Sequence, residues 1–94
     1  MAIALVVTLP VQEGKSEEFE KVFLGLRDQV LANEDGCEHY DLYKQDDTTY
    51  IVLERYKDQA AFDAHGQTAY FKAAGPALGA VLGGAPDMKI LQSV

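Results

Sequence analysis

His65 is the side chain with the clearest chemical potential in the sequence. It lies in the segment KDQAAFDAHGQTAYFKA, where Phe62, Tyr70 and Phe71 are close along the chain and few charges are near. An imidazole titrates near neutral pH and can therefore act as a general acid or base. Such a histidine is either the polar group of an aromatic pocket or a structural residue at the end of a short helix. The local sequence leaves both interpretations open.

The tyrosine and phenylalanine residues are candidates for the walls of such a pocket. The chain has 5 tyrosines and 4 phenylalanines among its 94 residues. Aromatic side chains most often fill a core or a subunit interface, where a buried tyrosine hydroxyl finds a hydrogen-bond partner. The alternative is a cavity in which hydroxyl groups donate to a ligand. The residues that we expect to contact a ligand in that case are Tyr40, Tyr56, Phe62, Tyr70 and Phe71.

Glu54 is a second candidate for acid–base chemistry or ligand binding. It lies in the β-prone segment TYIVLERYK, on the same strand face as Tyr56. If that face is buried, the carboxylate must either be paired with a cation or have an altered proton affinity. Arg55 points to the opposite face, whereas Arg27 or Lys44 could form the pair, within or between subunits. A structural ion pair is the simpler explanation, and a substrate-binding role is the functional one.

Other catalytic groups are poorly represented. His39, His65 and Cys37 show none of the spacings of a zinc site, so we expect no metal. The glycines of GAVLGG (Gly79–Gly84) follow a helical segment, whereas the dinucleotide-binding GxGxxG motif follows a strand. Cys37 has no basic neighbour that would stabilise a thiolate, and we expect a buried, unreactive thiol.

The composition argues against several classes of partner. The net charge is -7 and the pI is about 4.6, whereas nucleic acids and anionic membranes attract basic proteins. No apolar run approaches the roughly 20 residues that span a bilayer, and MAIALVVTLP lacks the basic start of a signal peptide. A single cysteine forms no intramolecular disulfide, so we expect a reducing, cytoplasmic location.

Hydrophobic periodicity predicts the order strand, helix, strand, strand, helix, strand. The first strand covers Ile3–Leu9, and the first helix runs from Ser16, as its cap, to about Asn33, with Gly36 at positive φ in the exit turn. The remaining predicted elements are strands at Cys37–Gln45 and Thr49–Lys57, a short helix capped by Asp58 and ended by Gly66, a helix capped by Thr68 and kinked or interrupted at Pro76, and a final strand in MKILQSV.

This order predicts an α+β fold with a single domain over residues 1–94. The architecture is a ferredoxin-like βαββαβ unit with an antiparallel four-stranded sheet. Both helical segments then cover the same face of the sheet. The first strand is apolar on both faces, with Leu5 on one and Val6 on the other, so whichever face the helices leave uncovered would expose apolar residues. Because that surface is too apolar for water, we expect a homodimer that packs sheet against sheet.

Several segments resemble the antibiotic biosynthesis monooxygenase family of dimeric α+β barrel proteins. EDGCEHYDLY is similar to the family's acidic residue, glycine, cysteine and tyrosine at the second strand. IVLERYKDQAAFDAHGQTAYF follows its pattern of apolar strand, Glu, aromatic residue, amphipathic turn, His, and Thr or Ser before an aromatic residue. KILQ resembles the closing strand, so the resemblance covers essentially the whole chain.

The resemblance implies a dimeric α+β barrel and an oxygenase that uses no flavin, haem or metal. Such enzymes oxidise phenolic or quinol aromatics to quinones, so the implied partners are a small aromatic substrate and O2. His65 would accept the phenolic proton, the tyrosines named above would donate hydrogen bonds, and the phenylalanines would form walls.

Departures from the family pattern narrow the expected activity. The chain has no tryptophan, and its first strand has no asparagine. Haem-degrading relatives use both residues, so haem degradation is disfavoured, and a large polycyclic substrate is less expected than a small one. Two other functions stay open. One is an isomerase of a small hydroxy-ketone with His65 and Glu54 as proton carriers. The other is a dimeric binding module without catalysis.

Overall fold

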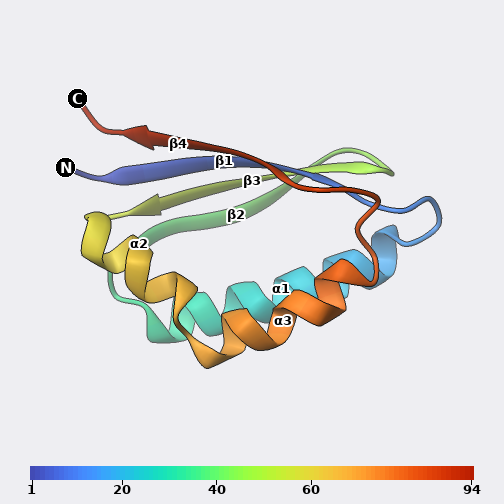
Figure 1. Ribbon diagram of the computed structural model, residues 1–94, viewed down its shortest axis with the longest axis horizontal. Coiled ribbons are helices and arrows are strands. Elements are labelled where there is room, and N and C mark those ends of the chain that lie inside the picture. The colour runs from blue at the N-terminus through green and yellow to red at the C-terminus, as the bar shows by residue number, and fades with distance from the viewer.

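The computed structural model describes residues 1–94 as two layers, a sheet and a set of helices on one of its faces (Figure 1). No helix has the length and apolar character needed to cross a membrane. The elements in chain order are β1 (Ile3–Pro10), α1 (Ser16–Asn33), β2 (Cys37–Asp46), β3 (Thr49–Tyr56), α2 (Gln59–Gly66), α3 (Ala69–Gly79) and β4 (Asp87–Gln92).

The sheet has the strand order β2-β3-β1-β4, and every neighbouring pair is antiparallel. The two chain ends lie at the same end of the molecule (Figure 1). The predicted α+β, ferredoxin-like βαββαβ fold is confirmed, with the second helical segment divided into α2 and α3.

The core lies between the sheet and the helices. Along β1, buried and partly buried residues alternate, because successive strand residues point to opposite faces. The buried set of β1 meets an apolar stripe of α1 that recurs every three or four residues. The main contributors are Leu5, Val7, Phe19, Phe23, Val30, Val52 and Tyr56.

The sheet face without helices is apolar in its centre, as predicted. Val6 and Leu53 are register partners on neighbouring strands, and both are partly exposed there. Tyr43 of β2 and Leu91 of β4 are about half exposed, at 50% and 51%. Pairing of this face with a second copy stays a prediction.

The helix caps follow the sequence prediction in two cases out of three. The Asp58 side chain accepts a hydrogen bond from the Ala61 amide, and the Thr68 hydroxyl accepts one from the Phe71 amide. The predicted Ser16 cap is wrong, because the Ser16 hydroxyl donates instead to the Asp47 carbonyl over 3.3 Å.

Pro76 does not interrupt the last helix. The α3 helix continues through Pro76 to Gly79. The nitrogen of Pro76 can donate no hydrogen bond, so one backbone hydrogen bond of the helix is missing there. We predicted a kink or an interruption at Pro76; the interruption is wrong, and the kink stays a prediction.

Gly36 is required for close packing, whereas its predicted positive φ is wrong. The only residue with positive φ is Gly14, at 81°. A Cβ atom at position 36 would lie 2.6 Å from the Cβ of Ala61, on α2. The absence of a side chain at Gly36 thus lets the loop after α1 lie directly against α2.

Gly36→Ala should therefore destabilise the fold by about 1–3 kcal/mol, the usual cost of overpacking. Gly25→Ala is the matched control, because Gly25 is an exposed position of α1 whose added Cβ would meet nothing within 4 Å. That control should stabilise the helix by about 0.5–1 kcal/mol. Thermal unfolding followed by circular dichroism measures both, and equal melting temperatures would contradict the packing argument.

Candidate active site

His65 occupies the last turn of α2 and is buried, with 4% of its surface exposed. The Asp58 cap begins this short helix, and the helix turns the imidazole inward toward the sheet. The ring centroid lies 5.4 Å from that of Tyr40, 5.4 Å from that of Tyr56 and 4.7 Å from that of Phe71. These rings come from β2, β3 and α3, so the fold brings four predicted site residues together.

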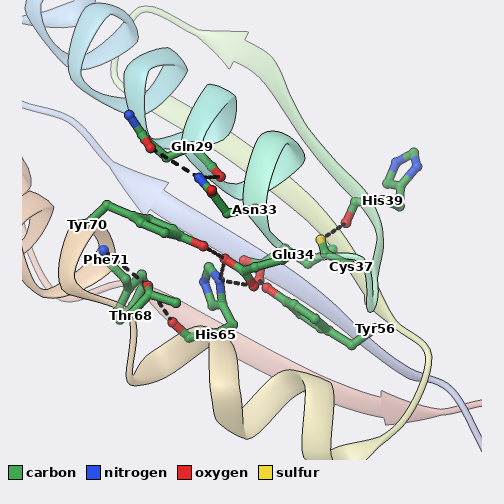
Figure 2. A network of polar contacts seen from close by, with 11 residues as sticks. Gln29, Asn33, Glu34, Cys37, His39, Tyr56, His65, Thr68, Tyr70 and Phe71 are labelled. Atoms are coloured by element: carbon green, nitrogen blue, oxygen red, sulfur yellow. Dashed lines mark hydrogen bonds and ion pairs between the residues drawn. The ribbon is translucent and has the colours of Figure 1, made fainter.

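One ring nitrogen of His65 is held by Glu34, a residue that no local sequence pattern marks as part of a site. The Nδ1 atom lies 3.0 Å and 3.1 Å from the two carboxylate oxygens of Glu34. The Tyr70 hydroxyl donates a hydrogen bond to the same carboxylate (Figure 2). A carboxylate can only accept here, so it fixes the proton of the neutral imidazole on Nδ1. The Nε2 atom is then left with its lone pair.

The Nε2 atom has no hydrogen-bond partner in the chain, although the residue is buried. No fully enclosed side-chain nitrogen or oxygen lacks a partner, so Nε2 must border open space. His65 lines a cavity of about 300 Å³. We infer that the lone pair of Nε2 is directed into this cavity. The other lining residues are Leu5, Glu54, Phe62, Asp63, Gly66, Phe71 and Met88.

A second cavity of about 160 Å³ adjoins the first and is almost entirely apolar. The two share Glu54, Phe71 and Met88 as lining residues, so they form adjacent parts of one hollow between the sheet and the helices. Tyr40 lines the second cavity, and its hydroxyl has no partner within the chain. This hydroxyl is therefore available to donate a hydrogen bond to a bound molecule.

Glu54 lies on the helix-covered face of the sheet, opposite Leu5 on β1 and Tyr40 on β2. Its Oε1 accepts a 2.7 Å hydrogen bond from the Tyr56 hydroxyl. Burial is the main cause that raises the pKa of this carboxyl above its usual value, followed in size by the opposing effects of the Tyr56 hydrogen bond and the His65 charge. Glu54 borders both cavities, where its second oxygen can meet a ligand.

The ion pair considered for Glu54 is not formed within the chain. Arg27 pairs with Asp41 at 3.2 Å, and Lys44 pairs with Asp47 at 3.0 Å. Both cations are thus held by surface carboxylates, and Glu54 is left without a cationic partner of its own. A partly buried carboxylate without a cationic partner is costly for stability and is typical of a functional position.

The tyrosines of the site are hydrogen-bond donors at neutral pH. Burial raises the pKa of Tyr40 and of Tyr56 well above the usual value, with Glu54 as the next cause in both. Burial and the hydrogen bond to Glu34 raise the pKa of Tyr70 to about 12. All three hydroxyls therefore keep their protons.

The remaining predicted residues occupy different positions around His65. Phe62 packs on Tyr56, with ring centroids 5.4 Å apart, and lines the cavity. Tyr70, in contrast, directs its hydroxyl to Glu34 and lines a separate, open groove of about 610 Å³. Direct contact of Tyr70 with a substrate stays a prediction. In the structure its hydroxyl binds the Glu34 carboxylate, and Tyr70 does not line the cavity.

Cys37 has the environment of an unreactive thiol. Its Sγ donates a 3.5 Å hydrogen bond to the His39 carbonyl. Burial raises the pKa of Cys37 to about 11, so the thiolate is scarce at neutral pH. No three His, Cys, Asp or Glu side chains are grouped so that they could hold a metal ion.

Comparisons with known proteins agree on the family. The family model described as antibiotic biosynthesis monooxygenase matches residues 2–77. A Bacillus subtilis protein, the candidate monooxygenase YcnE, is 35% identical over 72 residues, which cover 74% of this chain and 75% of YcnE. The crystal structure of a candidate antibiotic biosynthesis monooxygenase from Caulobacter crescentus is 47% identical, with a TM-score of 0.95 over 99% of this chain and 90% of that one.

A more distant solved structure shares the fold. A variant of SnoaB, a cofactor-independent oxygenase from Streptomyces nogalater, is 21% identical, with a TM-score of 0.84 over 98% of this chain and 92% of SnoaB. At this identity the likeness speaks for the fold alone. The family model matches most of this chain, and the relatives from Bacillus subtilis and Caulobacter crescentus agree with it. The chain therefore belongs to the antibiotic biosynthesis monooxygenase family.

Proposed function

We propose that this protein is a cofactor-independent monooxygenase that oxidises a small phenolic or quinol aromatic to a quinone with O2. The observation that carries the proposal is the unpartnered Nε2 of a buried histidine at an aromatic cavity, with Nδ1 held by Glu34. A family of monooxygenases and a fold shared with a cofactor-independent oxygenase support the reaction class.

The reaction begins with removal of the phenolic proton by His65 Nε2. The phenolate is a far better electron donor than the phenol, and it reacts with O2 to form a carbon–oxygen bond on the ring. Loss of the ring hydrogen as a proton and cleavage of the O–O bond then give the quinone carbonyl. The second oxygen atom leaves as water, and the two protons that it takes up equal in number the two hydrogens that the substrate has lost. The substrate supplies all the electrons, so the protein provides a base, hydrogen bonds and a dry cavity.

The size of the hollow favours a small substrate. Its two parts measure about 300 Å³ and 160 Å³. Pockets for drug-sized ligands span about 300–1,000 Å³, so this hollow is at the lower end. Phe71 borders both parts and offers its ring as a wall for an aromatic substrate. We therefore expect a substrate of one or two aromatic rings.

Two groups are placed to hold the polar ends of a quinol. The Tyr40 hydroxyl can donate to the oxygen on which negative charge develops. The Glu54 carboxylate can accept a hydrogen bond from a second substrate hydroxyl. These roles, with His65 as base, make a substrate with two hydroxyl groups the preferred candidate.

Oxygen consumption with a simple hydroquinone tests the proposed function. A simple hydroquinone gains one oxygen atom on its ring in this reaction, so an oxygen electrode and visible absorbance should report one O2 consumed for each hydroxyquinone formed, above the rate of autoxidation. Hydrogen peroxide as the reduced product would contradict the monooxygenase stoichiometry. No enzyme-dependent oxygen uptake with a panel of one- and two-ring phenols would overturn the proposal.

One alternative has an observation in its favour. His65 and Glu54 border the same cavity, which is the arrangement for moving a proton between two atoms of a hydroxy-ketone. Exchange of a substrate α-proton in deuterated water without oxygen uptake would identify such an isomerase. Tight binding of an aromatic dye with neither activity would identify a binding module.

We also propose that the protein is a homodimer. The support is the helix-free sheet face, where Val6, Leu53, Tyr43 and Leu91 form an apolar surface. Burial of this face against a second copy would bring two sheets together, as in a dimeric α+β barrel. Sedimentation equilibrium at micromolar concentration measures the assembly state.

A further inference from the structure

Two hollows meet at the pair formed by His65 and Glu34. The cavity that holds the candidate substrate is lined by His65 and not by Glu34. The open groove of about 610 Å³ is lined by Glu34 and not by His65. The two hollows share no lining residue, and the 3.0 Å contact between Nδ1 and the carboxylate is the polar link from one to the other.

We propose that Glu34 receives the substrate's proton from His65 and releases it into this groove, so that protons leave the site by a route separate from the substrate's. The inference rests on the proposed function for its substrate, a phenol. The steps balance: the phenolic proton moves to Nε2, the proton on Nδ1 moves to Glu34, and Glu34 passes it to water. The imidazole ends neutral, with its proton on Nε2, and recovers its first tautomer by exchange before the next turnover.

Glu34 has the access that this route requires. Its side chain is 11% exposed, compared with 4% for His65, so water reaches the carboxylate but scarcely reaches the imidazole. The residue follows α1 directly, and its backbone amide closes that helix by donating to the Val30 carbonyl over 2.9 Å. The carboxylate is therefore anchored at its backbone and open to water at its side chain.

Tyr70 positions the carboxylate for this transfer. Its hydroxyl donates to the Oε2 atom of Glu34, while Oε1 makes the closer contact with His65 (Figure 2). With its pKa raised to about 12, the hydroxyl stays protonated and acts only as a donor. The carboxylate is thus prevented from rotating away from the imidazole.

Other titratable groups around the pair affect any pH profile and must be considered with it. The imidazole packs against residues of β2, β3 and α3, and each contributes an ionisable side chain to the surroundings. The cavity side adds two carboxyls and the groove side a thiol and further charges. The groups are Tyr40, Tyr56, Tyr70, Glu54, Asp63, Cys37, Asp35, Lys57 and Asp58.

Anaerobic binding of 4-nitrophenol tests the transfer without any oxygen chemistry. The ionised form of this phenol absorbs visible light, so absorbance reports the fraction deprotonated in the cavity, and quenching of tyrosine fluorescence reports binding. Glu34→Gln keeps an acceptor for Nδ1–H but can take no proton. The equilibrium constant for ionisation of bound nitrophenol should fall about tenfold in this variant, with binding retained.

Asp35→Asn is the matched control, because Asp35 is exposed, lines the same groove and removes the same charge one residue away. It should ionise nitrophenol as the native protein does. Glu34→Ala opens space beside the groove, and added formate should restore ionisation there in a concentration-dependent manner. Formate cannot restore a function that depended only on the packing of the Glu34 side chain.

The outcomes separate this inference from the proposed function. Equal ionisation of bound nitrophenol in Glu34→Gln and the native protein, or no effect of formate on Glu34→Ala, would overturn the proton route. Normal ionisation and formate rescue with no oxygen uptake from any phenol would preserve the route and overturn the oxygenase. A folded Glu34→Gln variant, verified by circular dichroism, is the condition for either comparison.

Discussion

Replacing His65 by asparagine should lower the rate of quinol oxidation by about 10²–10⁴-fold, the contribution typical of a positioned general base. The asparagine amide can still donate a hydrogen bond to Glu34, as Nδ1 does over 3.0 Å in the native protein. It offers the cavity no basic nitrogen, because an amide oxygen accepts a hydrogen bond but does not take up the proton, so the phenolic proton has no base. Because Glu34 keeps a donor, the folded state should survive the substitution.

Alanine at the same position is a less informative variant. It leaves the Glu34 carboxylate with only the Tyr70 donor and empties the space between Tyr40 and Phe71. Loss of a partner for a buried polar group costs about 1–3 kcal/mol, and the cavity adds to it. A fall in activity of His65→Ala would therefore mix lost catalysis with lost stability.

The acidity of the substrate provides a readout that a structural histidine would not affect. A phenol that is already ionised in solution needs no base, so the ratio of native to variant rates should shrink as the substrate becomes more acidic. His39→Asn is the control, because His39 is a surface histidine paired with Asp41 at 3.1 Å. Oxygen uptake across a series of substituted hydroquinones measures the trend. A constant ratio, or an unchanged rate in His65→Asn, would remove His65 as the base.

The main features of the fold follow from local sequence. The alternation in β1, the apolar stripe of α1 and the caps at Asp58 and Thr68 depend on residues that are close in the chain. These signals place the histidine at the end of α2 and put Glu54 on the same strand face as Tyr56. The sequence left open which face the helices cover, and the strand register of the structure answers that question.

What the sequence did not reveal depends on contacts between distant segments. Glu34 and His65 are separated by 31 positions, and they meet only because the loop after α1 packs on α2. An acidic residue at a helix exit is usually solvated, so nothing local marks Glu34 as a partner. The same packing explains Gly36, whose small size serves the contact with Ala61 and not a turn with positive φ.

The Glu54 ion pair shows the limit of counting charges. Arg27 and Lys44 were suitable partners by residue type, yet each has a surface carboxylate within 3.2 Å. Strand pairing instead places Glu54 between Leu5 and Tyr40, on a face where no cation reaches it. Periodicity shows which side chains share a strand face, whereas the covered face and the choice of partners require the three-dimensional register.

Glu54→Gln should raise the free energy of unfolding at pH 8 and lower the activity. Such a trade-off is expected for a functional residue whose charge destabilises the fold. Glutamine keeps an oxygen for the Tyr56 hydroxyl, which donates to Oε1 over 2.7 Å, and removes a partly buried charge that has no cationic partner. The expected gain is of order 1 kcal/mol, or about 4–8 °C in melting temperature for a domain of this size.

The dependence of this gain on pH follows from the raised pKa of Glu54. The folded protein binds the Glu54 proton more tightly than the unfolded chain, so its stability is greatest below the unfolded pKa and declines as pH rises through the folded pKa. The glutamine variant lacks this decline. The stability difference should therefore be small at pH 4 and larger at pH 8, where denaturant unfolding measures it. Glu38→Gln, which alters an exposed pair with Arg55, should change stability little at either pH.

The activity of Glu54→Gln distinguishes binding from a purely structural cost. If the carboxylate accepts a hydrogen bond from the second hydroxyl of a quinol, its loss should lower kcat/KM by about 10- to 100-fold, the range for a hydrogen bond to a charged group. A phenol with a single hydroxyl never makes that contact, so its oxidation should be much less affected. Equal losses for the two substrates would exclude this role, and a variant that is both less stable and fully active would show that Glu54 is paired outside the cavity.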